Sequence, residues 1–89
     1  MSIGWDNKKA ALNLKNHKVG FDEASTVLAD PLVQYSLNDH PDGNRWEYIG
    51  HSYRNNLLYV VTVEETEEEI RIISAREATP SERKQYEKG

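Results

Sequence analysis

The sequence contains no cysteine, and its 89 residues include one phenylalanine, one methionine and three prolines. Without cysteine, neither a disulfide framework nor a thiolate metal site can form, which is typical of proteins in a reducing compartment. No hydrophobic run approaches the length of a membrane-spanning helix, and the N-terminus lacks the apolar core of a signal peptide. We therefore expect a cytoplasmic protein in which residues 1–89 form a single domain with a modest core.

Negative charge is concentrated in one short segment. Residues 64–69 hold five glutamates, and their combined charge is more negative than the net charge of −4 of the whole chain. The remainder of the chain is therefore slightly basic, so the overall charge does not exclude a nucleic-acid ligand. We interpret the glutamate run as a solvated hairpin tip, and an acidic docking patch for a basic partner is the alternative.

The N-terminal third of the sequence predicts two helices. Asp6 is placed to cap a helix over residues 7–17, in which small apolar residues recur at helical spacing. A second apolar stripe begins at Phe21 and ends before Asp30-Pro31, because a residue that precedes proline is pushed out of the α region. Both stripes are short, so these helices need a sheet to cover.

The middle of the chain alternates with the period of β-strands. The predicted strands are residues 33–37, 45–51, 57–63 and 70–76. Residues 57–63 are apolar on both faces, which is typical of a central strand. A dense group of turn-forming residues at 38–44 predicts a loop, and residues 3–5 are expected to form a short extended start. Short connections imply an antiparallel meander of about four strands, with two helices before it and one after it, in the α+β class.

The last predicted strand runs almost directly into a helix. Thr79, Pro80 and Glu82 form a strong start signal, with a threonine N-cap, proline at the first position and glutamate three residues on. The strand carries Arg71 and Arg76, and a helix N-terminus favours negative charge. This corner could hold a phosphate, or it could be an ordinary corner with solvated arginines.

Metal and cofactor chemistry has little support. The three histidines, His17, His40 and His51, are not spaced as a metal set. No carboxylate spacing indicates a calcium loop, and no glycine-rich phosphate loop is present. We expect neither a metal nor a cofactor.

The remaining polar set suits RNA cleavage without a metal. That reaction needs a base for the attacking 2′-hydroxyl, positive groups that stabilise the negative charge on the phosphorane oxygens, and a proton for the leaving 5′-oxygen. The guanidinium fork of arginine can bind two phosphate oxygens and keeps its charge. The catalytic candidates are His17, Arg45, Glu47, Arg71 and Arg76, and the RNA-binding candidates are Lys9, Lys15 and Lys18.

Several of these residues have ordinary alternatives. His17 is also well placed to meet the dipole at a helix C-terminus, and Glu47 could pair with a cross-strand arginine. Strand alternation puts Arg76 on the face opposite Arg71, unless the strand ends or bulges between them.

Residues spread over nearly the whole chain match the sequence pattern of a known family. These residues are Trp5-Asp6, Lys9-Ala10, Asn13, His17, Val19, Phe21, Glu23-Ala24, Asp30-Pro31, Gly50, the segment Ile70-Arg71-Ile72-Ile73-Ser74-Ala75-Arg76, Ala78-Thr79, Glu82-Arg83 and Tyr86. This pattern resembles the BrnT family of bacterial type II toxins. The resemblance implies a RelE-like fold and a ribonuclease activity that stops translation. The basic and imidazole positions of the family would fall on Lys9, His17, Arg71 and Arg76.

The resemblance also implies a partner, a cognate antitoxin of the BrnA type. That antitoxin would wrap the toxin through one segment and bind operator DNA through a ribbon-helix-helix domain. Two hypotheses follow. The first is a metal-independent endoribonuclease toxin that its antitoxin neutralises, which the arginines favour. The second is a toxin-derived binding module that acts with the antitoxin in transcriptional autoregulation and cuts RNA weakly or not at all, which the weak positive charge favours.

Overall fold

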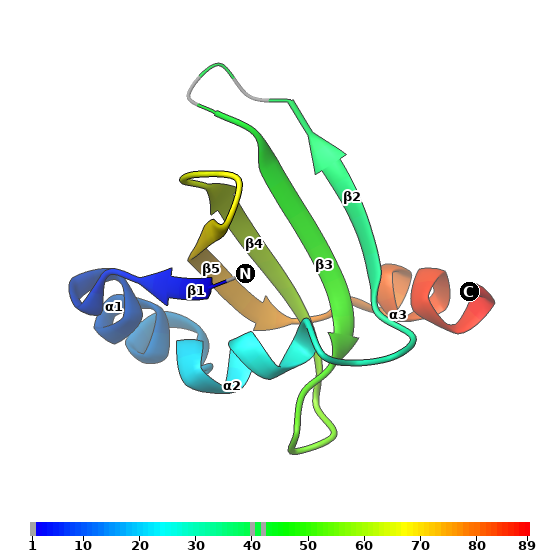
Figure 1. Ribbon diagram of the computed structural model, residues 1–89. Coiled ribbons are helices and arrows are strands. Elements are labelled where there is room, and N and C mark those ends of the chain that lie inside the picture. The colour runs from blue at the N-terminus through cyan, green and yellow to red at the C-terminus, as the bar shows by residue number, and fades with distance from the viewer. Residues whose placement is uncertain (1, 40, 42) are drawn as a thin grey trace.

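A computed structural model describes residues 2–39, 41 and 43–89. Its elements are, in chain order, β1 (Ser2–Trp5), α1 (Asn7–His17), α2 (Phe21–Val27), β2 (Gln34–Asn38), β3 (Arg45–His51), β4 (Leu57–Glu64), β5 (Glu69–Glu77) and α3 (Pro80–Lys88). Figure 1 shows a twisted sheet with α1 and α3 at opposite sides of it and α2 across its lower end. The α+β class and the three predicted helices are confirmed.

The sheet differs from the prediction in strand number and direction. Its order is β1-β5-β4-β3-β2, and β2 to β5 are antiparallel as expected. However, β1 is a fifth strand, and it pairs parallel to β5 with Ile3 opposite Ile70. The predicted antiparallel meander of about four strands is therefore present as β2–β5, but the sheet as a whole has five strands and is mixed. A four-residue segment is too short to show its period, and its partner lies near the other end of the chain.

Caps define both ends of α1 and the start of α3. The Asp6 carboxylate accepts a hydrogen bond from the Lys8 N–H at 3.0 Å, and Lys18 closes α1 in the left-handed conformation with φ of 62°. At α3, Thr79 and Glu82 form the reciprocal capping box that the sequence predicts. These caps satisfy backbone groups that a helix end leaves without partners.

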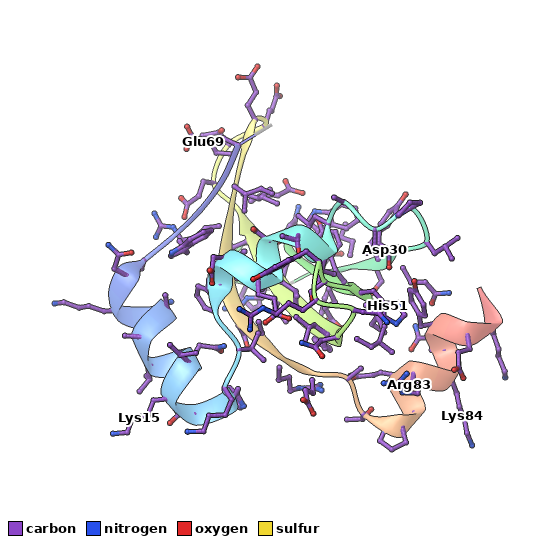
Figure 2. The ribbon with its side chains drawn as sticks, turned by 90° about the horizontal axis from the view of Figure 1, so that it is seen from below. Lys15, Asp30, His51, Glu69, Arg83 and Lys84 are labelled. Carbon is purple, nitrogen blue, oxygen red and sulfur yellow. The ribbon has the colours of Figure 1, made fainter. Side chains whose placement is uncertain are left out.

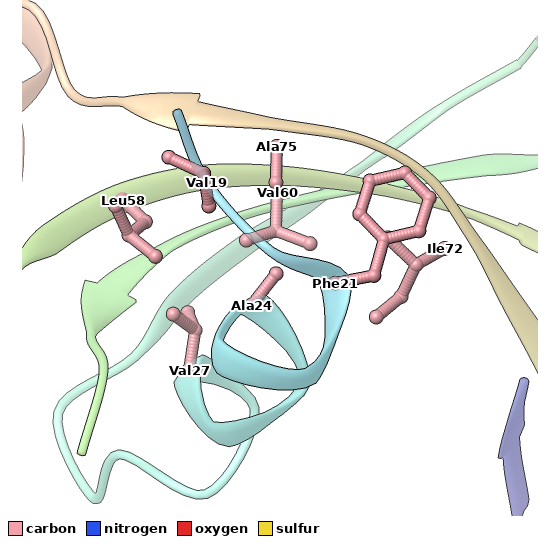
Figure 3. Close-up of a cluster of buried hydrophobic side chains, with 8 residues drawn as sticks. All are labelled: Val19, Phe21, Ala24, Val27, Leu58, Val60, Ile72 and Ala75. Atoms are coloured by element: carbon pink, nitrogen blue, oxygen red, sulfur yellow. The ribbon is translucent and has the colours of Figure 1, made fainter. Parts of the chain in front are cut away.

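The core lies between α2 and one face of β4 and β5 (Figure 3). Its buried side chains are Val19, Phe21, Ala24, Val27, Leu58, Val60, Ile72 and Ala75. Each large member contributes roughly 1.5–3 kcal/mol of transfer free energy. β4 is the middle strand of the five, as its apolar pattern predicts.

The two faces of the sheet therefore differ in their cover. The face that packs on α2 is the core face. We call the opposite face of β2–β5 the open face, and α3 packs against part of it through β3. No helix in the described part of the chain is long and apolar enough to cross a membrane. The predicted loop at 38–44 includes His40 and Asp42, which lie outside the described residues.

Candidate functional site

A β-bulge in β5 decides which face its arginines occupy. Thr62 opposes Ile72 and Val61 opposes Ser74, so Ile73 has no partner position on β4. The extra residue resets the alternation that follows it. Arg71 and Arg76 consequently share the open face, whereas Ile72 and Ala75 both point into the core.

Arg45 and Glu47 of β3 lie on the same open face. Arg45 and Arg71 both oppose Val63 of β4 from its two sides. Their Cα atoms are therefore separated by two strand spacings of about 4.8 Å each. Glu47 lies one step further along and opposes Val61. The face thus presents two guanidinium groups beside a carboxylate.

Glu47 is held by two side-chain hydrogen bonds. Its Oε1 accepts from the Tyr59 hydroxyl at 2.6 Å, and its Oε2 accepts from Asn38 Nδ2 at 2.9 Å. Burial and the hydrogen bond to Glu47 raise the pKa of Tyr59 well above its usual range. Tyr59 is therefore a hydrogen-bond donor at neutral pH, which fixes the orientation of the carboxylate.

Arg76 is held on the open face by an aromatic ring and a carboxylate. Its guanidinium lies 4.3 Å from the centre of the Tyr59 ring and donates to both oxygens of Glu82, at 2.8 and 2.9 Å. Such a bidentate pair is strong and directional. The hydrogen bond from Arg76 lowers the pKa of the Glu82 carboxyl. Glu82 therefore occupies the position at the start of α3 where the sequence suggested an anion.

Arg71 has a weaker partner than Arg76. Its Nε lies 3.0 Å from a Glu65 carboxylate oxygen, and both side chains are well exposed. Exposed pairs of this kind contribute little to stability. The Arg71 guanidinium is therefore accessible to another anion at low energetic cost.

A small cavity separates the open face from α3. Its volume is about 120 Å³, and its polar lining includes Glu47, Tyr59, Glu82 and Gln85. The cavity lies at the middle of the network that links Glu47, Tyr59 and Arg76. Two of its lining residues, Glu47 and Tyr59, are also joined by a hydrogen bond of 2.6 Å.

α1 is fastened to the edge of β5 next to Arg76. Asn13 Nδ2 donates to the Ala75 carbonyl at 2.8 Å, and its Oδ1 accepts from the Ala75 N–H at 3.2 Å, as a neighbouring strand would. Lys9 and His17 are four residues before and after Asn13, so all three share one stripe of the helix. Helical spacing therefore puts Lys9 and His17 on the side of α1 that carries the Asn13 anchor, one turn on either side of it, and both residues are exposed.

Two predicted RNA-binding lysines lie away from this stripe. Lys15 is on another side of α1, and Figure 2 shows it at the far side of the molecule from α3. Lys18 follows the helix and donates from its Nζ to the Lys15 carbonyl at 3.1 Å. Among the described residues, no hydrogen bond or ion pair joins Lys9, Lys15, His17 or Lys18 to the arginines of the open face.

The sequence reasoning missed a second polar cluster beside α3. The Tyr86 hydroxyl donates to the Asp30 carboxylate at 2.6 Å and lies 3.2 Å from His51 Nδ1 (Figure 2 labels Asp30 and His51). Burial and the hydrogen bond to Asp30 raise the pKa of Tyr86 to about 12. Burial opposes ionisation of Asp30, but hydrogen bonds from Tyr86 and from the His51 and Leu32 N–H groups lower its pKa overall. One signal was available in the sequence. His51 and Glu47 are separated by an even number of positions on the predicted strand, so their side chains share a face.

Within residues 2–39, 41 and 43–89, no three His, Cys, Asp or Glu side chains are grouped to hold a metal ion. The charged groups that the site does bring together are arginines on an open sheet face with an oriented carboxylate. This arrangement is suited to binding a phosphodiester, because the guanidinium forks can contact its oxygens.

The fold and the site define a small α+β protein that presents three arginines on one face of its sheet. The family model described as "Ribonuclease toxin, BrnT, of type II toxin-antitoxin system" matches residues 5–82, and the chain belongs to this family. The fold is similar to the crystal structure of the Brucella abortus ribonuclease toxin BrnT, with a TM-score of 0.66 and 22% sequence identity. That likeness covers 89% of this chain and 97% of the Brucella chain. No curated protein sequence matches the chain.

Proposed function

We propose that this protein is an endoribonuclease toxin that cleaves RNA without a metal ion and so stops translation in the cytoplasm. Membership of the BrnT family supports the ribonuclease class. The observation that carries the proposal is the bulge at Ile73, because it gives Arg71 and Arg76 a common face with Arg45 and Glu47. Three guanidinium groups can there neutralise the phosphate charge that a metal would otherwise meet.

The proposed reaction starts at the open face. Glu47 accepts the proton of the 2′-hydroxyl, and the hydroxyl oxygen attacks the adjacent phosphorus. Arg45, Arg71 and Arg76 stabilise the charge that develops on the phosphorane oxygens. The P–O bond to the 5′-oxygen then breaks, and a protonated histidine supplies that oxygen with a proton.

Two histidines are candidates for the acid. His17 lies on the α1 stripe next to the β5 edge, and His51 lies on the open face beside Tyr86. Lys9 shares the stripe of His17 and is placed to bind a phosphate that flanks the scissile one. Lys15 and Lys18 lie away from this stripe near the end of α1, so an RNA strand that also contacts them has to bend around the end of the helix.

The partner that we propose is a cognate antitoxin of the BrnA type. It silences the toxin in the complex and carries a ribbon-helix-helix domain that binds operator DNA. The toxin itself therefore contacts DNA only through the antitoxin. The type II class of the family supports an antitoxin partner.

One observation favours the binding-module alternative. Arg71 and Arg76 are already paired with Glu65 and Glu82 inside the chain. An RNA phosphate has to compete with these carboxylates, so the activity could be weak. In that case the chain would serve mainly to bind the antitoxin and support repression.

Induction of the isolated chain in a bacterium without the antitoxin tests the proposal. We expect growth arrest, and cell extracts should degrade added RNA in the presence of EDTA. Arg76→Ala should weaken both effects. Arg54→Ala, at an exposed turn remote from the open face, is the matched control. A wild-type chain that neither slows growth nor shortens RNA would leave the binding module as the function.

A further inference from the structure

An apolar groove lies on the core face of the sheet, beyond the part that α2 covers. Its volume is about 520 Å³, and its apolar lining is Leu28, Val33, Tyr35, Trp46, Tyr48 and Ile70. We call it the aromatic groove. Tyr35 lies 5.9 Å from Trp46 and 6.4 Å from Tyr48 between ring centres, so the three rings form one surface.

The groove exposes side chains that are normally buried. Tyr35 is 65% exposed, and Leu37, two residues on along β2, is 47% exposed. Leu37 opposes Trp46 and therefore continues the same surface toward the end of the strand. β2 is also the edge strand of the sheet. A contiguous apolar surface at a sheet edge is typical of a protein interaction site.

The rim of the groove is acidic. Glu64 and Glu67 line it, and Glu64 accepts a hydrogen bond from the indole N–H of Trp46. The rim belongs to the hairpin of β4 and β5, where residues 64–69 carry all five glutamates of the run. Figure 2 labels Glu69, the last residue of the run. This charge selects the occupant. RNA phosphates would be repelled, and a second copy of the chain would bring its own glutamates against these.

We propose that the aromatic groove is the anchoring site of the antitoxin, for an amphipathic segment with aliphatic residues on one side and Lys or Arg on the other. The aliphatic side chains pack on Tyr35 and Trp46, and the cations pair with Glu64 and Glu67. This inference rests on the antitoxin partnership of the proposed function, and it adds the location and chemistry of the contact.

The location separates binding from cleavage. The groove is on the core face, whereas Arg45, Glu47, Arg71 and Arg76 are on the open face. An anchored antitoxin must pass around the β2 edge to cover the cationic residues. Substitutions in the groove should therefore weaken antitoxin binding and leave RNA cleavage unchanged.

The test uses the protein that is encoded next to the toxin gene and that co-purifies with the tagged toxin. Its affinity for the purified toxin is measured by isothermal titration calorimetry with Tyr35→Ser and with Glu67→Lys. Tyr53→Ser is the control for the first variant, because Tyr53 is also 65% exposed but lies on the turn after β3. Glu87→Lys on α3 is the control for the second. Thermal unfolding verifies that each variant is folded.

We expect Tyr35→Ser and Glu67→Lys each to raise the dissociation constant by at least about tenfold, and each control by less than about twofold. RNA cleavage should stay at the wild-type level in all four variants. If the wild-type protein itself does not cleave RNA, that result counts against the proposed function and not against the groove. If Tyr35→Ser fails to fold, Glu67→Lys decides.

Three results would overturn the inference. One is a groove variant that binds the co-purifying protein as tightly as its control does. Another is a wild-type dimer that Tyr35→Ser converts to a monomer without a change in that affinity. The third is RNA binding that falls in the groove variants alone.

Discussion

The Arg76 guanidinium and the Glu82 carboxylate are joined by two hydrogen bonds of 2.8 and 2.9 Å, across the junction between β5 and α3. The same carboxylate closes the capping box of α3 by accepting from the Thr79 N–H at 2.9 Å. Glu82 thus links the start of the last helix to a proposed catalytic arginine. A substrate phosphate that binds Arg76 has to displace or share this carboxylate.

Glu82→Gln separates the catalytic role of Arg76 from its structural role. Glutamine preserves the capping box but removes the negative charge that occupies the guanidinium. We expect Glu82→Gln to cleave RNA at or above the wild-type rate, and Arg76→Ala to cleave about 10²-fold more slowly. The measurement is the initial rate on a labelled RNA. Equal losses in the two variants would indicate that Arg76 acts only by holding α3.

Asn13→Ala tests the anchor between α1 and β5. Asn13 is buried and satisfies both backbone groups of Ala75 as well as the Val19 carbonyl. Its removal leaves buried polar groups without partners, so we expect a loss of about 1–3 kcal/mol in the free energy of unfolding. Asn16→Ala, at an exposed position of the same helix, should change it by less than about 0.5 kcal/mol. Urea titration measures both, and amide exchange at Ala75 should accelerate only in the first variant.

Gly50→Ala tests the close approach of the α2–β2 connection to β3. A Cβ at Gly50 would lie 3.1 Å from side-chain atoms of Asp30, Val27 and Val33. Crowding on three sides should destabilise the protein by about 1–3 kcal/mol. Gly4→Ala is the control, because a Cβ there meets nothing within 4 Å. Thermal unfolding that ranks the two variants equally would contradict this account.

Acid should destabilise the protein through Glu82 and Asp30. Both have pKa values in the folded protein below their ordinary 4.5 and 3.8, so the stability that they contribute is complete above those values. It is lost as the pH falls through the folded values, because the unfolded chain then binds more protons. Urea unfolding should show a falling free energy below about pH 4.5, and a shallower fall in Glu82→Gln. Identical acid profiles would contradict the assignment to Glu82.

Elements with strong local signals could be predicted from the sequence. The capping residue Asp6 and the helical spacing after it gave the bounds of α1, and alternation gave those of β3, residue for residue. The start of α3 followed from Thr79, Pro80 and Glu82. Each of these signals lies within one turn or one strand, where local energetics dominate.

Features that depend on distant partners could not be predicted. The parallel pairing of β1 with β5 joins the two ends of the chain, and a segment as short as Ser2–Trp5 carries no period. The bulge at Ile73 was an open alternative, because alternation alone does not locate an extra residue. The Asp30–Tyr86–His51 cluster was missed, because its members come from the α2–β2 connection, β3 and α3, and each has an ordinary local role.

The positions of the glutamates on the molecule could not be read from the net charge. As a charge pattern, it suggested a solvated tip or an acidic docking patch. In the structure, two of its members line the rim of the aromatic groove, on the face opposite to the arginines. Glu65 of the same run instead pairs with Arg71 on the open face, so the run divides its charge between the two faces, which a net charge of −4 conceals.

Cleavage of a labelled RNA by the purified chain in EDTA, compared between wild type, Arg71→Ala and Arg54→Ala, tests the central claim most directly. Arg71 is exposed, so its loss should leave the unfolding free energy within about 0.5 kcal/mol of wild type. We predict cleavage by the wild type and Arg54→Ala, and a rate about 10²-fold lower for Arg71→Ala. Equal rates in all three proteins, or no cleavage by the wild type, would contradict a phosphate-binding role for the open face.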